Sequence, residues 1–204
     1  MTTPVRLRRA MTLAGLALIT LIAAGCASAR TSTSADDPVP AALEERLVAL
    51  DDAVTQWQQA MDLPDALRAA EAARNLVVGP DNALYGDADG DGTVSGENGE
   101  GLLPGETGAP GLAQEYVNAC VERDVLGGSW QDPQARWDEF DEVLAAWSPA
   151  GNTMPQLASH PQRVVGWATL TLAEGTDLDT AHEFAGHARL HVDVTDAAVY
   201  SCAS

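Results

Sequence analysis

The sequence contains no lysine. All 11 basic residues are arginine and they stand against 30 acidic residues, so the 204-residue chain has a formal net charge of −19. Three of the arginines lie in residues 1–25, which hold no acid, and the remainder of the chain therefore carries −22. A body this acidic repels phosphate backbones and anionic lipid headgroups. The composition argues against nucleic acid as a partner and against a polybasic membrane patch.

The sequence also lacks the short motifs of common enzyme classes. It has no Walker loop, no dinucleotide-binding fingerprint and no GxSxG nucleophile elbow. Carboxylate pairs occur throughout so acidic a chain, and none of them identifies an acid/base couple. Aromatic residues make up 5% of the chain. Four tryptophans at helical spacing either line a ligand site or, as we expect, pack in the core: Trp130, Trp137, Trp147 and Trp167. We predict no catalytic residue.

The N-terminal apolar run is too short to span a bilayer. It covers residues 11–25 and follows three arginines in the first ten residues, whereas a membrane helix needs about 20 apolar residues. Positive charge followed by a short apolar run that ends in small residues is typical of a signal peptide. A buried N-terminal helix is the alternative.

The end of this run, IAAGC, resembles the lipobox of bacterial lipoproteins, although the family prefers leucine where this chain has Ala23. The resemblance implies that residues 1–25 are a lipoprotein signal peptide and that Cys26 is the lipidated first residue of the mature chain. Acyl chains such as palmitate on Cys26 would anchor the protein to the extracytoplasmic face of the cell membrane. Residues 26–40, which are small, polar and closed by two prolines, read as the lipidated cysteine and a flexible tether.

Cysteine is scarce, and its number fits an oxidising compartment. With Cys26 acylated, Cys120 and Cys202 remain as an even pair. Outside the cytoplasm such a pair is expected to form a disulfide, which would hold the C-terminus in place. Two separate buried thiols are the alternative.

The chain has no segment in which apolar and polar residues alternate long enough to predict a strand. Helical spacing instead recurs from residue 41 onward, so residues 41–204 are expected to form one all-α domain, an antiparallel bundle of about six helices. Proline, glycine and aspartate signals place the helices at residues 41–61, 62–79, 110–126, 132–147, 161–174 and 179–198.

Two of the expected helical hairpins resemble a degenerate tetratricopeptide pair. Each carries a tryptophan on its first helix and two alanines seven residues apart on its second, namely Ala66 and Ala73, then Ala181 and Ala188. The resemblance implies a peptide-binding module. Most of that family's signature is missing, however, and an ordinary bundle with small contact residues is the favoured interpretation.

The strongest chemical signal is an acidic, glycine-rich loop between the second and third helices. Residues 87–98 read DADGDGTVSGEN, which resembles the calcium loop of EF-hands and dockerins. The resemblance implies side-chain ligands from Asp87, Asp89 and Asp91, a backbone carbonyl from Thr93 and a ninth-position ligand from Ser95. The ion would be structural calcium. A solvated acidic turn is the alternative.

The loop departs from that family at its twelfth position. Asn98 replaces the bidentate glutamate, which leaves Glu97 or Glu100 as substitutes. A glycine- and proline-rich stretch follows in place of an exiting helix. The wider segment, YGDADGDG followed by GLL, also resembles an extracytoplasmic bacterial module to which we attach no activity.

A second metal site is conceivable on the last helix. Glu183, His187 and His191 are four residues apart and share a helix face, and His187 with His191 has the spacing that can hold zinc or copper. Histidines in ordinary polar contacts are the favoured interpretation. The sequence thus predicts a non-enzymatic lipoprotein ordered by calcium, with a binding or scaffolding role at the cell envelope and an unidentified protein or peptide partner. A transition-metal protein and a tetratricopeptide-like binder are the alternatives.

Overall fold

The computed structural model describes residues 38–151 and 153–202, and regular structure within these ranges is helical throughout. Its elements are α1 (Ala41–Gln59), α2 (Leu63–Val78), the 3₁₀ turn η1 (Leu112–Gln114), the π-helical turn η2 (Val121–Val125), α3 (Pro133–Ala145), the 3₁₀ turn η3 (Pro149–Gly151), α4 (His160–Thr171) and α5 (Leu178–Tyr200). The all-α prediction is confirmed. The predicted signal peptide, Cys26 and most of the tether lie outside the described residues. In the described part of the chain, no helix is long and apolar enough to cross a membrane.

Local sequence signals explain where the helices begin. Asp62, Asp132, Ser159 and Asp177 each cap a helix by accepting a hydrogen bond from the backbone N–H three residues on. A proline follows three of these caps, in the first turn, where its missing N–H costs nothing. Gly79 ends α2 with a φ of 67°, a conformation that favours glycine.

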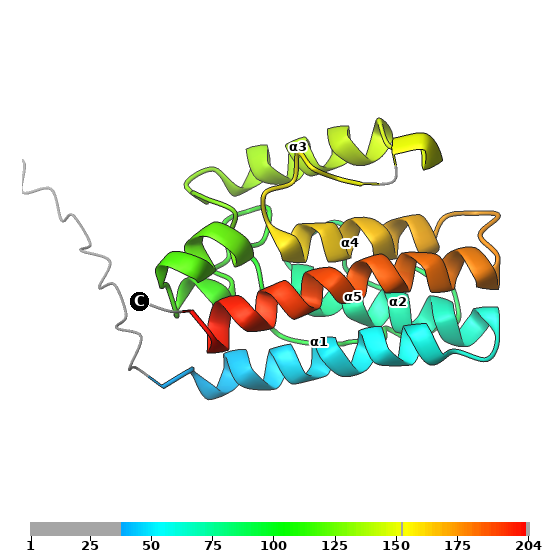
Figure 1. The fold of residues 1–204 in the computed structure, drawn as a ribbon, viewed down its shortest axis with the longest axis horizontal. Coiled ribbons are helices and arrows are strands. Elements are labelled where there is room, and N and C mark those ends of the chain that lie inside the picture. Colours follow the sequence, from blue (N-terminus) through cyan, green and yellow to red (C-terminus); the bar gives the residue numbers. More distant parts are fainter. Residues whose placement is uncertain (1–37, 152, 203–204) are drawn as a thin grey trace, which may run out of the picture. The chain divides into compact units, whose positions relative to one another are not determined.

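The antiparallel bundle around the core consists of α1, α2, α4 and α5 (Figure 1). Each of α1 and α4 turns back into the next helix, and the resulting hairpins pack on each other through α1 against α5 and α2 against α4. Trp57 and Trp167 are almost completely buried between them. The four alanines of the expected hairpins are also buried, at Ala66, Ala73, Ala181 and Ala188. Their small size lets the helices approach, as in an ordinary bundle.

The prediction of a continuous third helix over residues 110–126 is wrong. The segment forms the short turn η1 and, after residues 119–120, the π-helical turn η2. Asn118 is one reason, because its side-chain Oδ1 accepts hydrogen bonds from the backbone N–H groups of Cys120 and Val121, both at 2.9 Å, and so caps a helical turn that begins only after it. Gly111 is another, since a Cβ there would lie 2.2 Å from the carbonyl carbon of Leu103. Packing against the preceding loop therefore overrides the helical pattern.

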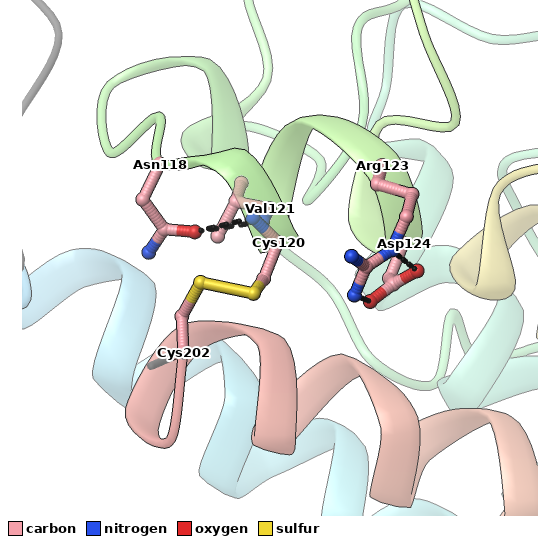
Figure 2. Close-up of a disulfide and its surroundings, with 6 residues drawn as sticks. All are labelled: Asn118, Cys120, Val121, Arg123, Asp124 and Cys202. Carbon is pink, nitrogen blue, oxygen red and sulfur yellow. Dashed lines mark hydrogen bonds and ion pairs between the residues drawn. A yellow bond between two sulfur atoms is a disulfide. The ribbon is translucent and has the colours of Figure 1, made fainter. Parts of the chain in front are cut away.

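The predicted disulfide is confirmed. Cys120, at the start of η2, is bonded to Cys202, two residues beyond α5, with their Cα atoms 5.7 Å apart (Figure 2). The bond joins the end of the last helix to a segment 82 residues earlier in the chain.

The tryptophans behave as core residues. Trp137 packs against both Trp130 and Phe140, whereas Trp147 and Trp167 pack against each other and against Phe184. Trp130 and Trp137 donate their indole N–H groups to the backbone carbonyls of Leu126 and Pro104. These contacts explain the positions of the four tryptophans, and no ligand is needed to explain them.

The substitution Asp196→Asn is expected to stabilise the fold at neutral pH. Burial, with the nearby charge of Asp51, raises the pKa of Asp196 from 3.8 to about 6. Because the folded state holds this proton more tightly than the unfolded state, the contribution of Asp196 to stability is lost as the pH rises through about 4 to 6. Asp196→Asn mimics the protonated form, so its free energy of unfolding should exceed wild type by about 1 kcal/mol at pH 7.5, after allowance for solvent screening.

The check is urea unfolding of Asp196→Asn and wild type at pH 5.0 and 7.5. The difference between them should shrink at pH 5.0. Glu142→Gln, an exposed position on α3, serves as the matched control for loss of one negative charge. Equal effects of both substitutions at pH 7.5 would show that net charge, and not the surroundings of Asp196, is responsible.

Candidate metal centre

One face of α2 holds the acidic loop in place through a buried carboxylate. Glu71 is 0% exposed. Its Oε2 accepts hydrogen bonds from the backbone N–H groups of Ala88 and Asp89, and its Oε1 accepts one from Ser95 at 2.7 Å. A single side chain of α2 therefore fixes both ends of the acidic turn. Charge-assisted bonds of this kind are among the stronger hydrogen bonds in proteins.

Asn75, one helical turn further along, extends the attachment. Its side chain donates to the carbonyls of Gly86 and Ser95 and accepts from the N–H of Gly86. The side chain of Asn98 in turn donates to the backbone carbonyl of Asn75 at 2.7 Å. Gly96 lies so close to α2 that a Cβ there would be 2.5 Å from the carbonyl oxygen of Ala72. The loop is thus packed directly on the helix backbone.

The acidic turn is shaped by aspartate side chains that bind its own backbone. Asp87 accepts from the N–H groups of Gly90 and Gly92, at 2.8 and 2.9 Å, and Asp89 accepts from Asp91 at 3.0 Å. Gly90 and Gly92 have φ values of 75° and 89°, which other residues rarely adopt. The alternation of aspartate and glycine therefore has a direct conformational role.

Three carboxylates converge at this turn. Glu71, Asp87 and Asp89 each place one oxygen so that the three atoms lie within 4.8 Å of one another. Partial burial and the negative charges of Glu71, Asp91 and Asp87 raise the pKa of Asp89, although a backbone hydrogen bond from Asp91 opposes the shift. The fold therefore holds like charges together, an arrangement that a bound cation would relieve.

The predicted ligands divide into two groups. Asp87 and Asp89 join the cluster, but Asp91 turns to Arg68, whose Nε lies 3.3 Å from its Oδ2. The backbone hydrogen bond from Thr93 is the largest factor that lowers the pKa of Asp91, and Arg68 adds to it. Ser95 contributes its backbone to the contacts with Glu71 and Asn75.

The substitutes for the twelfth position lie elsewhere. Neither Glu97 nor Glu100 belongs to the carboxylate cluster found in the described residues. The side chain of Asn98 faces α2, and the backbone carbonyl of Glu100 accepts a hydrogen bond from Arg46. Glu71, from the preceding helix, supplies the third carboxylate instead.

The donor set suits a hard cation. Carboxylate oxygens are the ligands that calcium prefers, and calcium tolerates irregular geometry better than magnesium does. Glu71, Asp87 and Asp89 are the side chains that would hold the ion, which would supply positive charge to offset theirs. The oxygen-only chemistry of this cluster gives no reason to expect zinc or copper.

The histidines of α5 make different contacts. His187 stacks on Trp167 with ring centroids 4.5 Å apart, and its Nε2 lies 3.9 Å from Oε1 of Glu183. His191 instead meets His160 of α4, with 3.0 Å between their Nδ1 atoms. Burial, with the charges of His160 and Arg163, lowers the pKa of His191 to about 3. The three predicted ligands thus have partners on both α4 and α5.

Glu71 is the residue that the sequence motif does not reveal, because it lies outside the loop. A signal for it exists in α2, where Arg68, Glu71 and Asn75 follow the i, i+3, i+7 spacing of one helix face. Each of the three binds the acidic loop.

Comparison with known proteins identifies no relative of this chain. No family model matches it, and neither a curated protein nor a solved structure matches it.

Proposed function

We propose that this chain is an extracytoplasmic, membrane-anchored lipoprotein domain whose acidic loop is ordered by calcium, with a non-enzymatic binding or scaffolding role at the cell envelope. The observation that carries the calcium proposal is the buried Glu71, whose carboxylate accepts hydrogen bonds from the loop backbone and lies beside Asp87 and Asp89. The ion would complete a site built jointly by α2 and the loop.

The setting of the site supports this assignment. The Cys120–Cys202 disulfide is compatible with an oxidising compartment outside the cytoplasm. Calcium sites in extracellular modules commonly have a Kd of about 10⁻⁴–10⁻³ M, so a site with few ligands could still be useful there. The lipid anchor on Cys26 follows from the lipobox resemblance.

The test is thermal unfolding of the full chain, first stripped with a chelator and then titrated with calcium or zinc. At a calcium concentration 10 to 100 times Kd, binding to the folded state should add about 1.4–2.7 kcal/mol of stability, which raises Tm by several degrees. Zinc at micromolar concentration should have no comparable effect. An unchanged Tm at calcium concentrations up to about 10⁻² M, ten times the weakest expected Kd, would contradict the proposal.

Two asparagine variants separate a calcium ligand from its neighbour. Asp89→Asn keeps an oxygen able to accept from the N–H of Asp91 but removes one charge from the cluster. It should melt at or above the wild-type temperature in chelator and lose the calcium response. Asp91→Asn makes the same chemical change in a carboxylate that binds Arg68, so it should keep most of that response.

The two alternative functions remain predictions. A zinc or copper response that alanine at His187 and His191 abolishes would favour a transition-metal protein. A tetratricopeptide-like role would require a peptide to bind in a concave groove lined by the helical hairpins.

A further inference from the structure

The outer side of the α1–α5 helix pair carries a groove with exposed apolar side chains. Two adjoining hollows share Val48 and Asp52, and one of them is also lined by Asp196 and Tyr200. Val48 is 55% exposed and Tyr200 is 50% exposed. We call this surface the α1–α5 groove and define it by Glu44, Val48, Asp51, Asp52, Asp196 and Tyr200.

The groove is strongly negative around this apolar centre. Four of its six defining residues are acidic. Arg189 lies nearby on α5, but its guanidinium already binds Asp51 at 2.7 Å and Asp193 at 2.9 Å. Burial, with the charges of Glu44 and Asp196, raises the pKa of Tyr200, which places its hydroxyl in the same negative field.

Asp196 adds a half-buried carboxylate to the groove. Its Oδ1 is buried and has no hydrogen-bond partner among the described residues. An unpaired buried acceptor costs free energy, and a cation beside the same half-buried carboxylate would offset part of that cost through its charge. The position of this oxygen, next to exposed Tyr200, favours a ligand with a cationic donor and an apolar group side by side.

We propose that the α1–α5 groove binds a cationic amphipathic segment of a partner protein, which places an apolar side chain between Val48 and Tyr200 and arginine or lysine side chains on Asp52 and Asp196. Charge complementarity selects the basic groups, because the chain without residues 1–25 carries −22. The exposed apolar centre selects an amphipathic polypeptide over a simple cation, which would gain nothing from Val48. The groove is formed by α1 and α5, so it does not depend on the metal centre on α2.

The test measures binding of fluorescent peptides to the full chain by anisotropy at pH 7.5. The probe is a helical peptide of leucine, alanine and arginine with its leucines on one face. A second peptide has the same composition in scrambled order, and a third has glutamate in place of arginine. We expect saturable one-to-one binding of the first, binding of the scrambled peptide that is weaker by roughly ten-fold, and none of the acidic one.

Variants locate the binding site. Val48→Ser and Asp52→Asn should each weaken binding several-fold. Glu142→Gln on α3 removes the same charge as Asp52→Asn and should leave the affinity unchanged. Equal loss in Asp52→Asn and Glu142→Gln, or equal binding of the ordered and scrambled peptides, would overturn the proposal in favour of unspecific attraction by net charge. Full competition by spermine with no effect of Val48→Ser would overturn it in favour of a simple cation site.

Discussion

Replacing Glu71 with glutamine is expected to lower the free energy of unfolding by about 2–4 kcal/mol, even in the presence of a chelator. The carboxylate accepts hydrogen bonds from three backbone N–H groups, of Ala88, Asp89 and Ser95. A glutamine side chain has only one acceptor atom, so its NH₂ group must face at least one of these donors. The variant both leaves a donor unsatisfied and removes the buried charge that attracts the others.

Urea unfolding of wild type and Glu71→Gln measures this loss. Glu142→Gln is the matched control, since it makes the same chemical change at an exposed position and should alter stability by less than about 0.5 kcal/mol. Equal stability of Glu71→Gln and wild type would contradict the role given to the buried carboxylate.

The calcium response of the same variant gives an independent result. Glu71→Gln removes one of the three clustered carboxylates, so the midpoint of a calcium titration should rise at least about ten-fold. Asp89→Asn should lose calcium affinity without the loss of stability, because it removes a repelled charge and keeps a hydrogen-bond acceptor. If neither variant changes the calcium response, the ion is bound elsewhere, whereas the structural role of Glu71 is judged by the chelator data alone.

Helices whose signals are local could be predicted from the sequence. The apolar residues at helical spacing between Leu43 and Trp57 predict α1, because they all face one side of a helix. Their side chains are buried in the structure. Asp62 and Gly79 predict the ends of α2 because caps depend on a few neighbouring residues. The segment before Leu126 has the same apolar spacing, but Asn118 and the contact of Gly111 with Leu103 interrupt it. The second of these is a tertiary contact that spacing cannot reveal.

Only part of the candidate site could be predicted from the sequence, because some of its contacts are local and others are tertiary. Asp87 and Asp89 could be predicted because their roles are set within one short turn. Glu71 joins them from 16 or more residues earlier in the chain. Arg68, which is 23 residues before Asp91, binds the carboxylate of Asp91 and keeps it out of the cluster. Which carboxylate meets which partner depends on how the loop folds back over α2. That choice follows from packing and not from the spacing of the motif.

Removal of the disulfide is expected to lower the free energy of unfolding by at least as much as Glu71→Gln. In the chain-entropy model, a bond between residues 82 positions apart restricts the unfolded state enough to stabilise the fold by about 4.5 kcal/mol. The closed segment contains α3, α4 and the whole of α5. The double variant Cys120→Ala with Cys202→Ala should therefore melt about 10 °C below wild type.

Thermal melting with and without reductant separates the bond from the side chains. Reductant should lower the Tm of wild type to about that of the double variant and leave the double variant unchanged. Because Cys202 lies two residues beyond α5, amide hydrogen exchange should rise first in the last turns of that helix, where it contacts η2. A wild-type Tm that does not respond to reductant, although alkylation shows both thiols to be free, would mean that packing of α5 against α1 and α4 fixes the C-terminus without help from the bond.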